Sequence, residues 1–401
     1  MGVTESKLEK DFGNDFPEGE HFFGLENYGN TCYCNSILQA LYFCIPFRLN
    51  LIQYYINNVR DSRFAPDTLL AQTAELFYTI ATQRKRCGVL GPKKFLHTLK
   101  RENELFQSFM QQDAHEFLNY LLNNIAETLE KETQPNKPKN QSIAGSTFVH
   151  KLFEGILTNY TRCEACGTIT CKSEAFLDLS LDIEQNTSLT QALSNFTNIE
   201  YLRDDDKFYC DNCNSKQNAM KGIKIKHLPR ILVLHQKRFK YIKQLQRYKK
   251  LMHRVVFPLE FRVESIEEDP TEQEKLYNLF AIVIHVGSGP NSGHYVTIVK
   301  SRGRWLLFDD DNIELINERD IHLCFGSTNE MMNQIRRTDC SYILFYQQMS
   351  EYNSTEIIDS NTDLSHHATV YNPSATNGHT ETNGQQYSAP LKPETEIHNN
   401  T

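Results

Sequence analysis

The chain has 401 residues, of which 39% are hydrophobic and 23% are charged, as in an ordinary globular protein. Its formal net charge of −8 comes mostly from the segment after Ser350, which holds seven acidic residues and one lysine, so the remainder is close to neutral and carries no electrostatic footprint for nucleic acid. No run approaches the roughly 18 apolar residues of a membrane span, and the N-terminus has no apolar signal core, so we expect no transmembrane segment.

The eleven cysteines are an odd number in a long chain and do not suggest a disulfide framework. They favour a reducing compartment, in which cysteines bind metals or act in catalysis. We therefore expect a cytoplasmic location, with the nucleus as an additional one.

Residues 1–22 are polar, and we expect them to form a flexible segment. The first six residues, Met-Gly-Val-Thr-Glu-Ser, match the N-myristoylation pattern, with Gly2 as the acceptor. A single acyl chain with no basic cluster beside it would anchor the protein to a membrane only weakly.

From residue 23 to about residue 130 the apolar residues recur mostly with helical spacing. A Gly- and Asn-rich stretch at 24–31 leads into an amphipathic helix, and Pro46 ends its pattern. Further helices are predicted over 68–80, 92–99 and 113–129.

Cys32 would lie in the first turn of the first of these helices. Unpaired backbone N–H groups and the helix dipole favour an anion there, so a thiolate forms more easily. Asn27 is a side-chain donor five residues upstream that a loop could fold back onto the same spot. A nucleophile on a helix N-terminus with an amide donor nearby indicates acyl transfer. The alternative is a buried cysteine in a core helix, which is the better interpretation for a cysteine that has no partners.

A cluster of polar residues opens the helix predicted at 113–129. Asp113 is placed to cap this helix, and Glu116 follows three residues later, as in a capping box. Capping alone is a sufficient structural reason for both acids, so a functional role needs further support.

Residues 131–145 contain two prolines and several Lys and Asn, which predicts a surface loop. Beyond this loop the apolar period becomes that of strands. Residues 148–161 and 169–183 are expected to be the two arms of a hairpin.

Two CxxC pairs, Cys163 with Cys166 and Cys210 with Cys213, are separated by 43 residues. Four thiolates in two such pairs fit a closed, tetrahedral, structural zinc site. The alternative, four unrelated cysteines, is disfavoured because two independent pairs occur in one chain of a reducing compartment. Cys171 lies nearby and is left out of the site.

Strands dominate from residue 223 onward, and the order of helices first and strands later argues for an α+β architecture. Apolar runs predict strands over 231–234, 279–286, 294–299, 305–308 and 341–346. Residues 240–255 hold six Lys or Arg and are expected to form a mobile basic loop. After about residue 350 the chain has no Phe or Trp, and we expect residues 350–401 to be a disordered acidic tail.

A cysteine hydrolase needs a base that takes the thiol proton and a group that holds the base. His294 stands where the Gly-rich stretch 287–293 enters a strand, and Asp309 ends the next strand. Neighbouring strands would bring this imidazole and carboxylate within hydrogen-bonding range, where the acid fixes the tautomer of the base. Four other residues compete for these roles on composition alone: His235, His285, Asp310 and Asp311.

Four motifs together resemble those of the ubiquitin-specific proteases. Residues 29–36, Gly-Asn-Thr-Cys-Tyr-Cys-Asn-Ser, look like the cysteine box of that family, although Cys34 stands where many members carry Met. Residues 292–296, Ser-Gly-His-Tyr-Val, followed by 305–310, Trp-Leu-Leu-Phe-Asp-Asp, resemble its histidine box. Residues 112–117, Gln-Asp-Ala-His-Glu-Phe, and the two CxxC pairs match as well. The similarity covers roughly residues 23–349 in the family's order and is closest to the ubiquitin-specific protease 12 and 46 subgroup.

The resemblance implies a papain-like cysteine peptidase of the α+β class. Its helical thumb would span about 23–145, its β-rich fingers about 146–225 and its β-rich palm about 226–349. Zinc would brace the tips of the fingers, and the catalytic cleft would lie between thumb and palm.

The resemblance also implies residue roles. Cys32 would be the nucleophile, His294 the general base and Asp309 the orienting acid, with Asp310 assisting. Asn27 and the backbone N–H of Cys32 would form the oxyanion hole. The positions that match those gripping the arginines of the ubiquitin tail are Gln112, Asp113 and Glu116. Loops at 240–256 and 286–293 would close over that tail, and the zinc ligands would be Cys163, Cys166, Cys210 and Cys213.

The implied reaction is hydrolysis of the isopeptide or peptide bond after the last Gly of ubiquitin, and ubiquitin and ubiquitinated proteins would be the partners. Members of the subgroup are activated by WD-repeat β-propeller proteins, one docking on the fingers and another near the palm. The competing interpretations are a non-catalytic ubiquitin-binding scaffold, which would lack a triad residue, and a papain-like protease of general peptides, which would need neither zinc-braced fingers nor the acidic pair.

Overall fold

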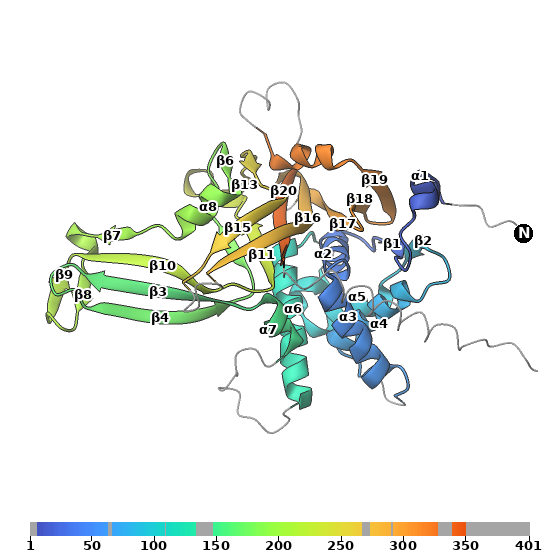
Figure 1. Ribbon diagram of the computed structural model, residues 1–401, viewed down its shortest axis with the longest axis horizontal. Coiled ribbons are helices and arrows are strands. Elements are labelled where there is room, and N and C mark those ends of the chain that lie inside the picture. Colours follow the sequence, from blue (N-terminus) through green and yellow to red (C-terminus); the bar gives the residue numbers. More distant parts are fainter. Residues whose placement is uncertain are drawn as a thin grey trace, which may run out of the picture. The chain divides into compact units, whose positions relative to one another are not determined.

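The computed structural model describes residues 6–62, 66–108, 110–133, 147–266, 273–289, 292–327 and 339–349. Figure 1 shows the helices of the first part of the chain beside the sheets formed by the later part, the α+β order expected from the sequence. Gly2, most of the predicted loop 131–145 and the predicted tail 350–401 lie outside the described residues. Among the described helices, none combines the length and the apolar character that crossing a bilayer demands.

Helix α2 (Cys32–Tyr42) lies at the centre of the helical part, and all of its residues are buried. A helix that is covered on every side needs partners all round. Helices α3 and α6 supply them on one side, and strands β16, β17 and β18 supply them on the other. The other helices are α1 (Lys7–Phe12), α3 (Ile45–Tyr54), α4 (Leu69–Ala81), α5 (Lys93–Glu102), α6 (Ala114–Thr133), α7 (Phe148–Phe153) and α8 (Leu189–Phe196).

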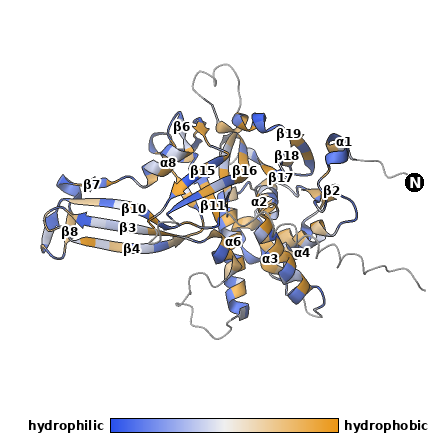
Figure 2. Ribbon diagram, viewed as in Figure 1, coloured by the Kyte–Doolittle hydropathy of each residue, from blue (hydrophilic) through white to orange (hydrophobic). Residues whose placement is uncertain are grey.

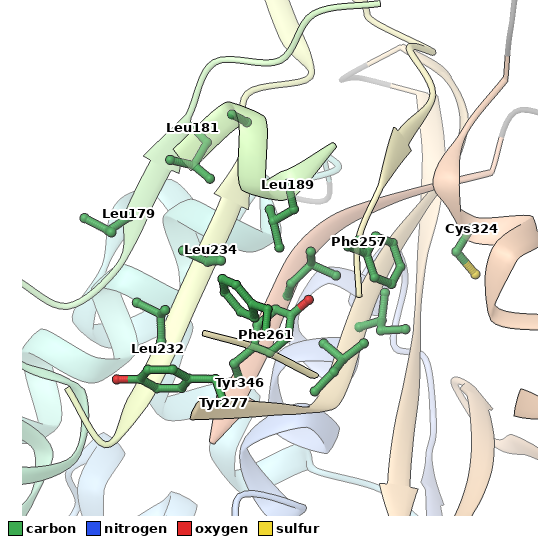
Figure 3. Packing of buried hydrophobic residues seen from close by; sticks show 14 of the residues in the cluster. Leu179, Leu181, Leu189, Leu232, Leu234, Phe257, Phe261, Tyr277, Cys324 and Tyr346 are labelled. Carbon is green, nitrogen blue, oxygen red and sulfur yellow. The ribbon is translucent and has the colours of Figure 1, made fainter. Parts of the chain in front are cut away.

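The largest sheet has eight strands in the order β19-β18-β17-β16-β20-β11-β5, with β15 paired to β16. Its strands are β5 (Leu179–Leu181), β11 (Ile231–Gln236), β15 (Glu260–Glu264), β16 (Glu274–Gly289), β17 (Ser292–Ser301), β18 (Arg304–Asp309), β19 (Asn312–Ile316) and β20 (Cys340–Gln348). On one face, buried residues such as Phe257, Phe261 and Tyr346 pack with leucines of β5, β11 and α8 (Figure 3). Burial of this apolar surface holds the smaller elements against the sheet.

A four-stranded sheet in the order β4-β3-β10-β7 extends from this body. Its strands are β3 (Gly155–Cys163), β4 (Ile169–Phe176), β7 (Glu200–Leu202) and β10 (Ala219–His227), and the short pair β8 (Phe208–Cys210) and β9 (Ser215–Gln217) follows near its tip. Nearly all residues of β4 are exposed, and Figure 2 shows polar residues spread along these strands. With so little apolar surface buried, the tip needs another source of stability.

Short pairs complete the fold: β1 (Phe22–Leu25) with β2 (Cys87–Leu90), β6 (Thr187–Ser188) with β14 (Val255–Val256), and β12 (Phe239–Ile242) with β13 (Arg247–Lys250). The last pair corrects the expectation of a mobile basic loop at 240–255. Tyr241 and Tyr248 face each other across this hairpin with ring centroids 5.2 Å apart, and such cross-strand aromatic pairs stabilise a hairpin.

The expectation of a flexible segment at 1–22 is wrong for the residues that the structure describes. Ser6 caps α1 in a reciprocal capping box with Glu9. Phe12, Phe16 and Phe22 then form a buried aromatic cluster, with the rings of Phe12 and Phe22 stacked at 5.6 Å. The polar composition hid this cluster because three well-spaced phenylalanines set no period.

The helix that begins at Cys32 ends at Tyr42, before Pro46 as expected, and Pro46 stands in the first turn of the next helix, α3, where its missing N–H costs nothing. One further expectation needs correction. Residues Phe148–Phe153, expected in a strand, form helix α7, which Thr147 caps by accepting a hydrogen bond from the backbone N–H of His150.

Arg48 and Glu20 form a buried ion pair that ties the N-terminal segment to α3. Two guanidinium–carboxylate contacts of 3.1 and 3.3 Å join them, and their side chains are only 7% and 3% exposed. The guanidinium also lies over the ring of Tyr42, 4.7 Å from its centroid. Removing one partner of such a pair leaves a buried charge without compensation.

We expect Glu20→Gln to lower the free energy of unfolding by about 3–5 kcal/mol, because Arg48 would remain charged and buried. Denaturant unfolding curves measure this change. Glu127→Gln is the matched control, since its pair with Lys131 is 66% and 70% exposed and should contribute less than about 1 kcal/mol. Equal effects of the two substitutions would contradict the structural role of the buried pair.

Candidate active site

Three elements bring the predicted triad together. Cys32 is the first residue of α2 and is 4% exposed, His294 lies near the start of β17, and Asp309 is the last residue of β18. Helix α2 packs on β17, where the hydroxyl of Thr297 donates a 2.8 Å hydrogen bond to the carbonyl oxygen of Ser36. Because β17 and β18 are antiparallel neighbours, the start of β17 with His294 and the end of β18 with Asp309 lie at the same end of the strand pair.

His294 bridges the thiol and the carboxylate. Its Nε2 lies 2.5 Å from Asp309 Oδ1, which leaves the other ring nitrogen for Cys32. The hydrogen bond with Cys32 is the main cause that raises the pKa of His294 to about 9, the bond to Asp309 and the negative charge of both partners add to it, and burial opposes it. The site therefore favours an imidazolium beside the sulfur at neutral pH.

Asp310 has a different set of partners from Asp309. Its Oδ2 is 3.8 Å from His294 Nε2, beyond hydrogen-bonding range, but it accepts a 2.7 Å bond from Asn27 Nδ2. Its Oδ1 accepts a 2.8 Å bond from Asn35. The geometry thus separates the two acids that sequence patterns left in competition: Asp309 contacts the histidine and Asp310 contacts the asparagines.

Asn27 is held at both ends of its carboxamide. Its Oδ1 accepts a hydrogen bond from the backbone N–H of Thr31 at 3.1 Å, while its Nδ2 donates to Asp310. These contacts fix which end of the amide is the donor and keep Asn27 beside the first turn of α2. One N–H of the amide serves Asp310, and the amide nitrogen carries a second.

The competing residues stand elsewhere or are unsuited to the role. Burial lowers the pKa of His285 to about 3 and that of His235 well below its ordinary value, so both are neutral and enclosed. Burial likewise raises the pKa of the Cys34 thiol well above its ordinary value, so Cys34 remains protonated.

Gly24 lets the hairpin that carries Asp309 and Asp310 approach β1. A Cβ on Gly24 would lie 2.5 Å from the carbonyl oxygen of Asp311, a distance at which the backbone has to move. The backbone N–H of Leu25 donates a 2.9 Å bond to the carbonyl oxygen of Asp310 at the same place. The close contact with β1 therefore holds the turn that carries Asp309 and Asp310 in place.

The three predicted tail-binding residues lie just before or at the start of α6. Asp113 Oδ1 caps the helix, accepting from the backbone N–H of His115 at 2.7 Å, and its Oδ2 accepts a 2.6 Å bond from Tyr342 Oη. Glu116 is exposed on the first turn. The Gln112 amide donates to Ser108 Oγ at 3.0 Å, within its own loop.

His115, Asp178 and His235 form a second polar cluster, between α6 and β11. His115 Nε2 is 2.7 Å from Asp178 Oδ2, and Ser180 Oγ bonds both Asp178 and His235 Nδ1, at 3.3 and 2.8 Å. The two imidazole rings stack with centroids 3.7 Å apart and an interplanar angle of 15°. A metal lies in the plane of each imidazole that binds it, so stacked rings do not share one ion, and the cluster serves as a polar tie between helix and sheet.

The four predicted zinc ligands lie together at the tip of the four-stranded sheet. Cys163 Sγ is 4.0 Å from Cys213 Sγ, Cys166 Sγ is 3.6 Å from Cys210 Sγ, and all four sulfurs lie within 4.8 Å of one another. A tetrahedral site with Zn–S bonds of about 2.3 Å has sulfurs about 3.8 Å apart. Gly167, at φ +71°, closes the turn of the first pair. These distances and this donor set fit a metal ion.

Sequence patterns missed several residues around the site. Gln111 bonds the backbone of Gly293. Two buried cations, Arg238 and Lys250, hold the β12–β13 hairpin by donating to backbone carbonyls. Lys250 Nζ donates to the carbonyls of His285 and Gly287 at 2.7 and 2.9 Å, and Arg238 Nη1 donates to that of Leu251 at 3.0 Å. Burial of cations with backbone carbonyls as their partners gives no sequence signal, since Lys250 falls within the segment 240–255 that was expected to be a basic loop and Arg238 just before it. The repeated Gln of residues 111–112 was the one visible hint for Gln111.

Comparison with known proteins agrees with this geometry. The sequence profile of the ubiquitin carboxyl-terminal hydrolases matches residues 23–346. The chain is 52% identical over 370 residues to ubiquitin carboxyl-terminal hydrolase 4 of Arabidopsis thaliana, which covers 87% of this chain and 99% of that protein. It is 51% identical over 362 residues to ubiquitin carboxyl-terminal hydrolase 12 of Salmo salar, which covers 86% of this chain and 95% of that protein.

Solved structures give the same result. The fold resembles a chain of the SAGA Ubp8/Sgf11/Sus1/Sgf73 DUB module bound to ubiquitin aldehyde, with a TM-score of 0.67 and 26% identity over 86% of this chain and 75% of that chain. A structure of this module bound to monoubiquitin matches with the same TM-score and covers 74% of its chain. The family and fold class expected from the motifs are confirmed, and the chain belongs to the ubiquitin carboxyl-terminal hydrolase family.

Proposed function

We propose that this protein is a deubiquitinase that hydrolyses the isopeptide or peptide bond following the C-terminal Gly of ubiquitin. The observation that carries the proposal is the row of Cys32, His294 and Asp309, in which the histidine contacts both partners. Relatives over nearly the whole chain are ubiquitin carboxyl-terminal hydrolases, and the structural neighbours hold ubiquitin or its aldehyde.

In the proposed mechanism, His294 takes the proton of Cys32, and the thiolate attacks the carbonyl carbon of the last Gly. The carbonyl oxygen becomes an oxyanion, which the Cys32 backbone N–H and the second N–H of the Asn27 amide stabilise. His294 then gives its proton to the leaving amine, and the C–N bond breaks to leave a thioester. Water, deprotonated by His294, attacks the thioester and releases ubiquitin and the thiol.

Asp309 and Asp310 support this cycle in different ways. Asp309 holds the His294 tautomer and stabilises the imidazolium. Asp310 assists by orienting Asn27, since it takes one N–H of the amide and so directs the other.

The arginines of the ubiquitin tail would meet Asp113 and Glu116, with Gln112 beside them. Glu116 is exposed for this contact, whereas Asp113 is anchored by Tyr342 and also caps α6. The segments proposed to close over the tail are the β12–β13 hairpin and the turn between β16 and β17, of which residues 290 and 291 lie outside the described residues. We also propose the division into a thumb of about 23–145, fingers of about 146–225 and a palm of about 226–349.

The four-cysteine cluster is proposed to hold one structural zinc ion. Its soft thiolate donors and sulfur spacing suit zinc, and the thinly packed tip of the sheet needs such a brace. None of the eleven cysteines, all of which lie in the described residues, forms a disulfide. This supports a reducing compartment, and we propose the cytoplasm together with the nucleus.

The scaffold alternative requires a missing or misplaced catalytic group. All three triad residues are present and in contact, so this alternative is disfavoured. A general papain-like protease is disfavoured by the acidic pair at α6 and by the cysteine cluster.

Ubiquitin with a C-terminal electrophile should add one ubiquitin mass to the wild-type protein and none to Cys32→Ser, because only the thiolate reacts at the tail's end. Intact-mass spectrometry measures the adduct. Cys32→Ala should also abolish turnover of a ubiquitin substrate. Absence of an adduct on the wild type, even with propeller partners present, would favour the scaffold alternative.

Asp309→Ala should lower kcat on the order of 10²-fold or more, and Asp310→Ala should lower it less, because Asp309 alone of the two bonds the histidine. Steady-state hydrolysis of a fluorogenic ubiquitin substrate gives both values. The reverse order would move the orienting role to Asp310.

The pH profile gives an independent readout of the same contact. Because the folded-state pKa of His294 is raised to about 9, the imidazolium persists at neutral pH and is lost as pH rises through that value. The kcat/KM of the wild type should therefore fall above about pH 9, and in Asp309→Asn the fall should begin at lower pH. An alkaline limb that does not move in Asp309→Asn would contradict the contact.

Elemental analysis of undenatured protein should find about one zinc ion per chain. Cys163→Ser should lose the metal and lower Tm, because Cys163 is fully buried among the four sulfurs. Cys171→Ser is the control, since Cys171 is exposed and outside the cluster, and should keep the metal. Undenatured protein without zinc would overturn the assignment.

We further propose that WD-repeat β-propeller proteins activate the enzyme, which the subgroup resemblance supports. Addition of such a protein should raise kcat on the order of tenfold through a coupling between the two binding sites. A purified chain already at full rate, with no response to the propeller, would contradict this proposal.

A further inference from the structure

A side-chain amide joins the loop before α6 to the catalytic histidine strand. Gln111 Nε2 donates to the carbonyl oxygen of Gly293 at 2.6 Å, and the backbone N–H of Gly293 donates to Gln111 Oε1 at 2.7 Å. The two residues are 182 positions apart in the chain. A carboxamide that both donates to and accepts from one residue imitates the pairing of a neighbouring strand.

Among the described strands, no residue is paired with Gly293 in the register of β16 and β17. The register between β16 and β17 shifts between Val286 and Gly289, so the residues before His294 stand at an irregularity of the ladder. Gly293 also packs tightly, because a Cβ there would collide with the side chain of His285 and the carbonyl of Val286. Gln111 binds the backbone N–H and C=O of Gly293, the groups that this irregular pairing does not use.

The carbonyl of Gly293 and the N–H of His294 belong to the same planar peptide unit. A hydrogen bond to that carbonyl therefore fixes the plane from which the His294 side chain departs. Since Nε2 of His294 is only 2.5 Å from Asp309 and the ring also bonds Cys32, a small rotation of this peptide would break the row of contacts.

We propose that Gln111 is a positioning residue for catalysis, which holds His294 in line with Cys32 and Asp309 and links that alignment to the loop that binds the substrate tail. The link is direct, because Asp113 follows Gln111 by two residues and is itself anchored to Tyr342 of β20. A ubiquitin tail that binds Asp113 therefore contacts the same loop whose Gln111 holds Gly293. The inference rests on the proposed function, because tail binding gives the link its use.

Cys32 alkylation by iodoacetamide tests the alignment without ubiquitin. The rate at Cys32, followed by peptide mass spectrometry against pH, reports the thiolate–imidazolium pair. Gln111→Ala should slow this rate near pH 7 on the order of tenfold, because a displaced imidazole no longer stabilises the thiolate. Gln111→Glu retains the acceptor for the Gly293 N–H but not the donor and should be intermediate. Gln53→Ala is the control and should match the wild type, because Gln53 is exposed and bonds Asn57, one helical turn further along the chain.

With a fluorogenic ubiquitin substrate, Gln111→Ala should lower kcat and leave KM nearly unchanged, and its alkaline limb should move to lower pH. A raised KM with wild-type alkylation would make Gln111 a binding residue and overturn the proposal. Unchanged rates in Gln111→Ala at unchanged Tm would overturn it as well. If Gln111→Ala lowers Tm strongly, Gln111→Glu decides by the same criteria. If the wild type does not react with ubiquitin that carries a C-terminal electrophile, only the proposed function is rejected. The alkylation comparison still tests the alignment of His294.

Discussion

The packing of α2 on β17 is the contact on which the site depends. Ser36 and Thr297, both buried, join the helix to the strand through a 2.8 Å hydrogen bond. Cys32 lies four residues before Ser36, about 6 Å along a helix, and His294 lies three residues before Thr297, about 10 Å along a strand. One anchored contact in the core thus brings both side chains to the same end of the helix and strand.

The acids at the end of β18 show how adjacent residues take different tasks. Successive side chains at a strand end and its turn point in different directions, and Asp310, with φ +50°, turns its carboxylate to Asn27 and Asn35 while Asp309 faces His294. The close approach of Gly24 to Asp311 keeps that turn in place. Orientation of the base and orientation of the amide donor therefore depend on one short hairpin.

Local patterns predicted much of the fold and most of the site. Helical spacing located α4, α5 and α6 to within a few residues, and the CxxC spacing picked the four sulfurs that the fold gathers. Composition left His294 in competition with His235 and His285, and only the resemblance to the histidine box selected it. The structure adds the physical reason, because His235 and His285 are buried and neutral. Asp309 and Asp310 differ only in three-dimensional partners, so composition left them equal.

Other features were beyond sequence patterns because long-range contacts create them. Phe12, Phe16 and Phe22 order the N-terminal segment by packing together, and the buried ammonium of Lys250 donates to two backbone carbonyls of β16. Gln111 gains a role from an irregular register in a strand far along the chain. Each of these depends on a partner that lies outside any local window.

The position of β20 has a consequence for synthesis of the protein. This strand is the last that the structure describes, yet it lies inside the large sheet between β16 and β11. Until the ribosome has made β20, β11 and β16 lack the strand that lies between them, and their backbone N–H and C=O groups on that side are unpaired. The domain thus completes its core only when residues 340–348 have emerged, and until then its unpaired strand edges make the incomplete chain prone to aggregation.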